Sequence, residues 1–171
     1  KRVEVAPKDG YNIYGIIKKI MSLTLDLPDH NYDMISLYGA HVNERNYQRV
    51  PLFYGNQSIS SRRGASSHQF NPFIAICRKD TDEVSGEIYG FNFVYSGNFL
   101  FEAEVNQFAG TRVIMGINPE GFGWTLEPNA VFNSPEVVMV YTPDGIGEMS
   151  RIFHRLYRKH LVRGKWKNIK R

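Results

Sequence analysis

The sequence has little cysteine and no long apolar run. Cys77 is the only cysteine among 171 residues, so no disulfide forms within the chain. It lies in the apolar segment 73–77, which favours a buried thiol in a strand over a reactive one. No apolar run reaches the roughly 20 residues that a membrane-spanning helix needs, and the first residues lack the pattern of a signal peptide. We therefore expect a cytoplasmic protein without membrane partners. Because the sequence begins without Met, we also expect a piece of a longer chain.

The spacings typical of metal and nucleophile sites are missing as well. None of the histidines pairs with another His or a Cys at a metal-ligand spacing. They are His30, His41, His68, His154 and His160. No serine lies in a Gly-x-Ser-x-Gly pattern, and Gly121-x-Gly123 is too short for a phosphate-binding loop. We expect neither a metal nor a cofactor.

Acidic residues are absent from the C-terminal end. Residues 151–171 hold nine of the 21 basic residues and none of the 17 acidic ones, so the other 150 residues are net acidic. A nucleic acid would suit such a basic tail. No nucleic-acid-binding motif accompanies the charge, however, and a solvated helix face running into a linker is the favoured interpretation. We expect no nucleic-acid partner.

Most of the chain consists of short apolar segments separated by turn signals. Turn signals recur every 8–12 residues, a pattern typical of an antiparallel β-sandwich. The first is Pro7-Lys8-Asp9-Gly10. The predicted strands are 16–27, 32–38, 45–54, 57–62, 73–78, 87–95, 99–107, 111–117 and 135–141.

The period becomes helical from about Gly147. One apolar stripe follows at helical spacing, formed by Met149, Ile152, Phe153, Leu156, Tyr157 and Leu161. Gly164 is a plausible helix stop. We therefore divide the chain into a sandwich over residues 1–143 and a helix with a basic tail over residues 144–171.

Glu102 and Glu104 are the most suggestive pair of carboxylates. Two residues apart on a strand, they lie on one face about 6–7 Å apart, a spacing that overlaps that of glycosidase acid and base groups. The strand alternates, however, with Phe99 and Phe101 on the opposite face. With the aromatic face inside, the glutamates face water rather than a catalytic pocket. A structural role is the favoured interpretation.

The polar segment 60–73 is the richest in binding chemistry. It contains Arg62, Arg63, His68 and Asn71. Guanidinium and amide groups suit carboxylates, backbone carbonyls or sugar hydroxyls. A structural loop at a sheet edge or a domain contact is the commoner outcome. Trp124, beyond a second loop, suits stacking on a sugar ring, although a packing Trp is more common.

Several motifs, in order along the chain, resemble bacterial α-galactosidases of glycoside hydrolase family 36. They are QSISSRRGASSHQ at 57–69, GFNFVYSGNF at 90–99, MGINP at 115–119, Phe132-x-x-Pro135-Glu136, and the segment from Met149 to His160-Leu161-x-Arg163-Gly164-Lys165-Trp166. Together they cover the chain from about Ser36 to its end. The family pattern has Trp where this chain has His41, which puts any interface made by that Trp in doubt.

The resemblance implies an N-terminal β-supersandwich followed by a catalytic (β/α)8 barrel and a small C-terminal β-domain. This chain resembles the later part of the N-terminal domain with its linker helix. The family releases terminal α-galactose from melibiose- and raffinose-type oligosaccharides with retention, using two barrel aspartates. Neither has a counterpart here, so no catalytic residue is carried over.

The resemblance also implies the partners. They are the protein's own barrel and the neighbouring subunits of a homo-oligomer, which is often a tetramer in the family. The candidate substrate-binding or interface residues are Arg62, Arg63, His68, Asn71 and Trp124. A free-standing carbohydrate-binding module is the alternative, with Trp124 and the tyrosines as stacking platforms. A nucleic-acid-binding protein ranks last.

Overall fold

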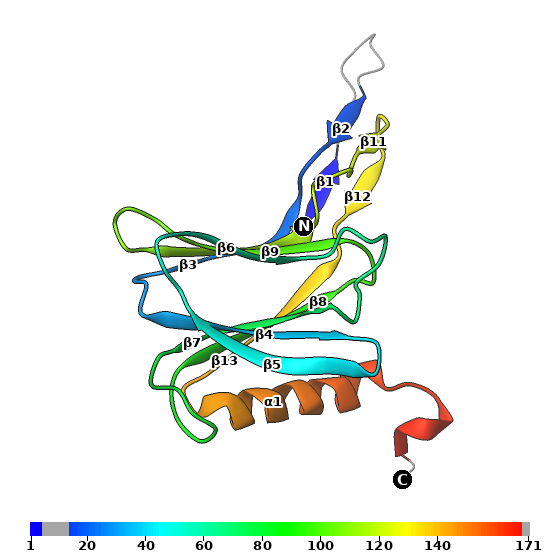
Figure 1. Ribbon diagram of the computed structural model, residues 1–171. Coiled ribbons are helices and arrows are strands. Elements are labelled where there is room, and N and C mark those ends of the chain that lie inside the picture. Colours follow the sequence, from blue (N-terminus) through cyan, green and yellow to red (C-terminus); the bar gives the residue numbers. More distant parts are fainter. Residues whose placement is uncertain (5–13, 169–171) are drawn as a thin grey trace.

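Two antiparallel sheets pack face to face in the computed structural model, which describes residues 1–4 and 14–168 (Figure 1). The four-stranded sheet has the order β3 (Met21–Leu27), β10 (Thr111–Ile117), β9 (Phe99–Val105), β6 (Gly55–Ser60). The five-stranded sheet has the order β13 (Glu136–Thr142), β8 (Ile88–Val94), β7 (Phe70–Arg78), β4 (Tyr32–Ala40), β5 (Asn43–Pro51). The predicted β-sandwich is confirmed.

A narrow arm of paired short strands projects from the sandwich (Figure 1). Strand β1 (Arg2–Glu4) pairs with β12 (Val131–Asn133), and β2 (Gly15–Ile17) pairs with β11 (Trp124–Leu126). The single strand predicted over 16–27 is therefore two strands, and the loop predicted around Trp124 is partly a strand. The turn predicted at residues 7–10 lies outside the described residues.

The core between the sheets follows the alternation seen in the sequence. Phe99, Phe101 and Ala103 of β9 are fully buried, while Glu104 is exposed and Glu102 partly so. Across the sandwich, Phe91 of β8 lies against Phe101, with ring centroids 6.0 Å apart. Since a period of two places alternate side chains on opposite faces, one strand supplies both the core and a solvated surface.

A second apolar cluster lies on the outer face of the five-stranded sheet, under helix α1 (Gly145–Leu156). Met149 and Phe153 of α1 are buried there against the sheet. Cys77 is fully buried in this cluster, as predicted, and burial raises the pKa of its thiol to about 11. Gly90 of β8 makes room for the helix, because a Cβ there would lie 2.6 Å from the Met149 Sδ atom.

The helix begins earlier and ends sooner than its stripe predicts. Its first N–H groups donate to a loop between β7 and β8: Gly145 to the Gly86 carbonyl and Ile146 to the Asp82 carbonyl, at 3.0 and 2.9 Å. After Leu156 the chain forms a π-helical turn, Tyr157–Leu161, and then a 3₁₀ turn, Lys165–Asn168. The wider π turn breaks the helical phase, so Leu161, expected in the buried stripe, is 54% exposed.

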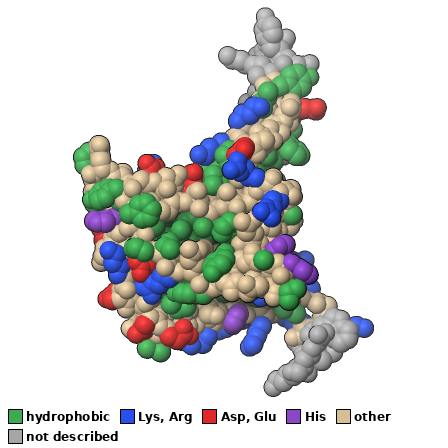
Figure 2. All heavy atoms as spheres, viewed as in Figure 1, with side chains coloured by type: hydrophobic (Ala, Val, Ile, Leu, Met, Phe, Trp, Pro, Cys, Tyr) green, Lys and Arg blue, Asp and Glu red, His purple; other side chains and the backbone are tan. Residues whose placement is uncertain are grey.

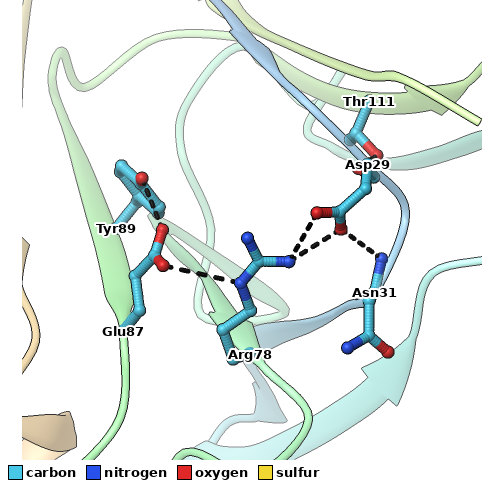
Figure 3. Close-up of polar contacts among 6 residues, drawn as sticks. All are labelled: Asp29, Asn31, Arg78, Glu87, Tyr89 and Thr111. Carbon is cyan, nitrogen blue, oxygen red and sulfur yellow. Dashed lines mark hydrogen bonds and ion pairs between the residues drawn. The ribbon is translucent and has the colours of Figure 1, made fainter.

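Arg78 ties the two sheets together at one end of the sandwich (Figure 3). Its guanidinium donates to both carboxylate oxygens of Asp29, at 2.7 and 2.9 Å, and forms a longer contact of 3.5 Å with Glu87. Thr111, from the other sheet, donates to the Asp29 carbonyl at 2.7 Å. Partial burial acts to raise the pKa of Asp29, but the hydrogen bonds from Arg78 and the Asn31 N–H outweigh it and lower the pKa.

Candidate functional site

Three loops meet at one end of the four-stranded sheet, and the polar segment predicted as a binding loop is one of them. Gly64 donates its N–H to the Asn98 side chain at 2.7 Å, and Ser66 donates to the Ser96 carbonyl at 2.8 Å. From the third loop, Asn118 donates its N–H to the Asn98 carbonyl at 3.0 Å. Segments far apart in the sequence are thus joined by backbone contacts.

A buried polar pair holds this loop cluster in place. Ser61 and Asn118 are each 5% exposed. The Ser61 hydroxyl donates to the Ala65 carbonyl at 2.7 Å, and the Asn118 amide donates to the Ser61 carbonyl at 3.2 Å. The Asn118 side-chain oxygen in turn accepts the Glu120 N–H at 3.0 Å. Because these buried groups have their partners, the loops are held to one geometry.

The loop cluster encloses a cleft of about 360 Å³. Its lining includes Arg62, Tyr95, Asn98, Asn118, Glu120 and Phe122. Arg62 forms an ion pair with Glu120, and both side chains are more than half exposed. An aromatic ring, amides and a charged pair are the groups that hold a sugar or a polar loop of a partner protein.

The predicted site residues do not form one site. Arg62 lines the cleft, while Arg63 and His68 are exposed and have no side-chain partner among the described residues. Asn71 lies within strand β7 and lines a different cavity, a groove beside α1. Trp124 is on the arm, 50% exposed, with its ring 5.3 Å from that of Phe132.

Sequence reasoning missed the other half of the cleft. Asn98, Asn118 and Glu120 are not among the predicted site residues; they lie in turn segments, Ser96-Gly97-Asn98 and the Asn-Pro-Glu-Gly segment at 118–121. Both segments carry turn signals in the sequence. Their contact with residues 61–66, however, depends on the pairing of β6, β9 and β10, which the sequence does not show. His41, the departure from the family pattern, is exposed in the turn between β4 and β5.

Glu102 and Glu104 lie on the outer face of the four-stranded sheet. Glu102 accepts a hydrogen bond from the Asn56 amide at 3.1 Å, and Glu104 is opposite Arg112 in the strand register. Neither residue lines the cleft or the groove. The structural interpretation of this pair, made from the alternation, agrees with their surroundings.

Within residues 1–4 and 14–168, no group of three or more His, Cys, Asp or Glu side chains is placed to hold a metal ion. The helices in the same part of the chain are too short or too polar to cross a bilayer.

Residues 11–127 match the Glycosyl hydrolase family 36 N-terminal domain. The chain belongs to glycoside hydrolase family 36. Residues 131–171 match the Melibiase family. The family predicted from the motifs is therefore confirmed.

Relatives and solved structures agree with the match. The chain is 52% identical over 153 residues to alpha-galactosidase AgaA of Geobacillus stearothermophilus, and the aligned residues make up 90% of this chain and 21% of AgaA. It is 45% identical over 155 residues to alpha-galactosidase 1 of Pediococcus pentosaceus, covering 91% and 21%. The crystal structure of AgaA superposes with a TM-score of 0.89 at 51% identity over 91% of this chain and 22% of AgaA. The chain spans about a fifth of the curated relatives that it matches.

The junction between the two family matches lies inside the fold. The first match ends at residue 127, after β11, and the second begins at residue 131, with β12. The second match therefore includes β13, which pairs along its length with β8 of the first, and α1, which packs on the same sheet. The two matched regions share one sheet and one apolar cluster.

Proposed function

We propose that this chain is the non-catalytic N-terminal domain region of an α-galactosidase, a retaining glycoside hydrolase that releases terminal α-galactose from melibiose- and raffinose-type oligosaccharides. Its role is to support the catalytic barrel and the assembly of subunits. The chemistry belongs to the part of the enzyme outside this chain. In this proposal the enzyme is a cytoplasmic homo-oligomer without a cofactor.

The observation that carries the proposal is the extent of the match. The N-terminal domain family covers 117 residues, from 11 to 127, and the α-galactosidases that match along nine-tenths of this chain are about four times as long as the chain. The two carboxylates that have a suggestive spacing, Glu102 and Glu104, lie on an open sheet face rather than in a cavity. This placement is consistent with a chain that has a structural rather than a catalytic role.

The exposed polar side chains are the proposed contact points. Arg62 lines the cleft, Arg63 and His68 are exposed on the same loop, and we assign all three to contacts with the barrel, a neighbouring subunit or bound sugar. Asn71 belongs to the groove beside α1, and Trp124 to the arm. The rigid backbone of the loop cluster, held by Ser61 and Asn118, favours a preformed contact surface.

One observation favours a second function, a free-standing carbohydrate-binding module. Trp124 is half exposed on the projecting arm, and Tyr95 lines the cleft. Aromatic rings of this kind stack on sugars. This alternative predicts that the chain alone binds an α-galactoside in solution, whereas the supporting role predicts no binding.

Hydrolysis of a chromogenic α-galactoside tests the main proposal. The purified chain is compared with the full-length enzyme that carries it. We expect activity in the full-length enzyme only. Activity in the chain alone would overturn the non-catalytic role and return attention to Glu102 and Glu104. Inactivity of both, together with sugar binding by the chain, would favour the carbohydrate-binding module.

A further inference from the structure

A groove of about 560 Å³ lies between α1 and the outer face of the five-stranded sheet. Helix α1 packs over β13 and β8 and leaves the β4–β5 side of this face uncovered. The floor of the groove is apolar and buried, formed by Ile35, Met149 and Phe153. Tyr47 of β5 stands at its wall and is 54% exposed. The groove is therefore a preformed apolar slot with an exposed aromatic side.

The polar residues of the groove carry positive or neutral groups only. No Asp or Glu lines it. Arg45 lines it and has no ion pair or side-chain hydrogen bond among the described residues, in contrast to Arg49 on the same strand, which binds Asp33 at 2.7 Å. The Asn71 Nδ2 atom is buried and also lacks a partner in the described part of the chain. These unpartnered donors are suited to a carboxylate.

The backbone at Arg45 is unusual. Its φ is +60°, in the left-handed region that residues other than glycine seldom adopt. It follows a register shift between Tyr38 and Ala40 in the pairing of β4 with β5. Bulges of this kind change the direction of side chains and are common beside functional sites. The strained backbone therefore coincides with an unpaired cation at the groove.

The groove also lies at the junction of the two family matches. Strands β4, β5 and β7 belong to the N-terminal domain match, whereas α1 belongs to the Melibiase match. Each match supplies one wall. Since α1 is continuous in sequence with the Melibiase region, that region is the polypeptide best placed to fill the groove.

We propose that this groove is the docking site of a segment of the catalytic Melibiase region that carries an apolar side chain beside a carboxylate. The apolar side chain packs on Met149 and Phe153, and the carboxylate accepts hydrogen bonds from Arg45 and the Asn71 amide. The docking fixes the catalytic region against the sandwich. This proposal rests on the proposed function, since it requires that the chain work within a longer α-galactosidase.

Site-specific photo-crosslinking in the full-length enzyme tests the docking. A benzophenone-bearing phenylalanine analogue replaces Tyr47, and the purified enzyme is irradiated and its crosslinked peptides are identified by mass spectrometry. We expect capture of a peptide from the same polypeptide, C-terminal to residue 171, that contains Asp or Glu. Capture only within residues 1–171, capture of a second copy in a mixture of isotopically light and heavy subunits, or no capture would overturn the proposal.

Two variants in the crosslinking background separate docking from folding. Arg45→Gln is expected to lower the yield of that crosslink about tenfold, the effect of losing one charge-assisted hydrogen bond. Lys79→Gln, which removes an exposed positive charge outside the groove, is the matched control and leaves the yield unchanged. Arg45→Gly also lowers the yield, yet it raises the melting temperature because glycine suits a positive φ. Unchanged capture in both Arg45 variants would contradict the proposed role of the guanidinium.

Failure of the docking and failure of the proposed function give different results. An active wild-type enzyme without the expected crosslink loses only the docking site. A full-length protein that does not hydrolyse α-galactosides loses the proposed function, whatever is crosslinked.

Discussion

The two faces of the five-stranded sheet are covered very differently. The inner face packs against a whole second sheet, and its large side chains, such as Phe91 and Ile74, are fully buried. The outer face is covered by one helix, which leaves a groove beside Tyr47 and Arg45. In Figure 2 hydrophobic side chains are also visible in the middle of the displayed face. The comparison teaches that the inner face is complete within this chain, whereas the outer face has room for another polypeptide.

The inner face should be the more sensitive to substitution. Phe101→Ala removes a ring that is fully buried between the sheets. We expect it to lower the free energy of unfolding by about 3–5 kcal/mol. Phe108→Ala, at a position that is 82% exposed, is the control and should change it by less than about 0.5 kcal/mol. Urea denaturation measures both, and equal losses would contradict the assigned core.

The outer face should respond to a smaller change, at the point where the helix is closest. The Cβ of Gly90→Ala would lie 2.6 Å from Met149 and 2.7 Å from Phe153. We expect a loss of about 1–3 kcal/mol from overpacking, with faster hydrogen exchange in α1. In Gly123→Ala the nearest atom is the Lys18 Nζ at 3.4 Å, so this control should preserve exchange. Unchanged exchange in both variants would show that α1 does not depend on close contact at Gly90.

The link between the sheets should make stability depend on pH. The pKa of Asp29 is lowered in the folded protein. Its contribution is therefore complete above the unfolded pKa, near 4, and is lost as the pH falls through the lower folded value. We expect Asp29→Asn to cost about 1 kcal/mol at neutral pH and to make the acid-induced loss of stability shallower. Denaturation curves from pH 7 to pH 3 test this, and parallel curves for the two proteins would exclude the link.

The smallest expected effect is a gain, at the open side of the outer face. Arg45→Gly relieves a positive φ without removing any ion pair seen among the described residues. We expect about 0.5–1 kcal/mol of added stability, measured by thermal unfolding of the chain. Arg49→Gly on the same strand should instead destabilise it, because Arg49 binds Asp33 and three carbonyl groups. A loss of stability in Arg45→Gly would mean that its side chain stabilises the chain itself.

The sequence was sufficient for the sandwich because local alternation decides which side of a strand is buried. Phe99 and Phe101 were placed inside, and Glu104 in water, from a period of two alone. The family followed from long motifs. The position of Cys77 followed from its apolar neighbours.

The candidate sites were harder, because they depend on contacts between distant segments. Nothing near Arg62 in the sequence indicates that Glu120 is its partner. Asn71 was grouped with the binding loop by proximity, yet it belongs to a strand and to the groove beside α1. Leu161 has helical spacing in the sequence, but the π-helical turn Tyr157–Leu161 rotates it away from the buried stripe of α1. The division at residues 143 and 144 stays a prediction.

The first turn of α1 is anchored to the loop between β7 and β8 by its own backbone N–H groups, those of Gly145, Ile146 and Gly147. The position of this loop therefore sets the position and direction of the start of the helix. A change in the length of this loop would tilt α1 and shift the polypeptide that follows the helix, without any substitution in either sheet. Substitutions in a surface loop distant in sequence from the helix can therefore change the angle between the sandwich and the polypeptide that follows α1.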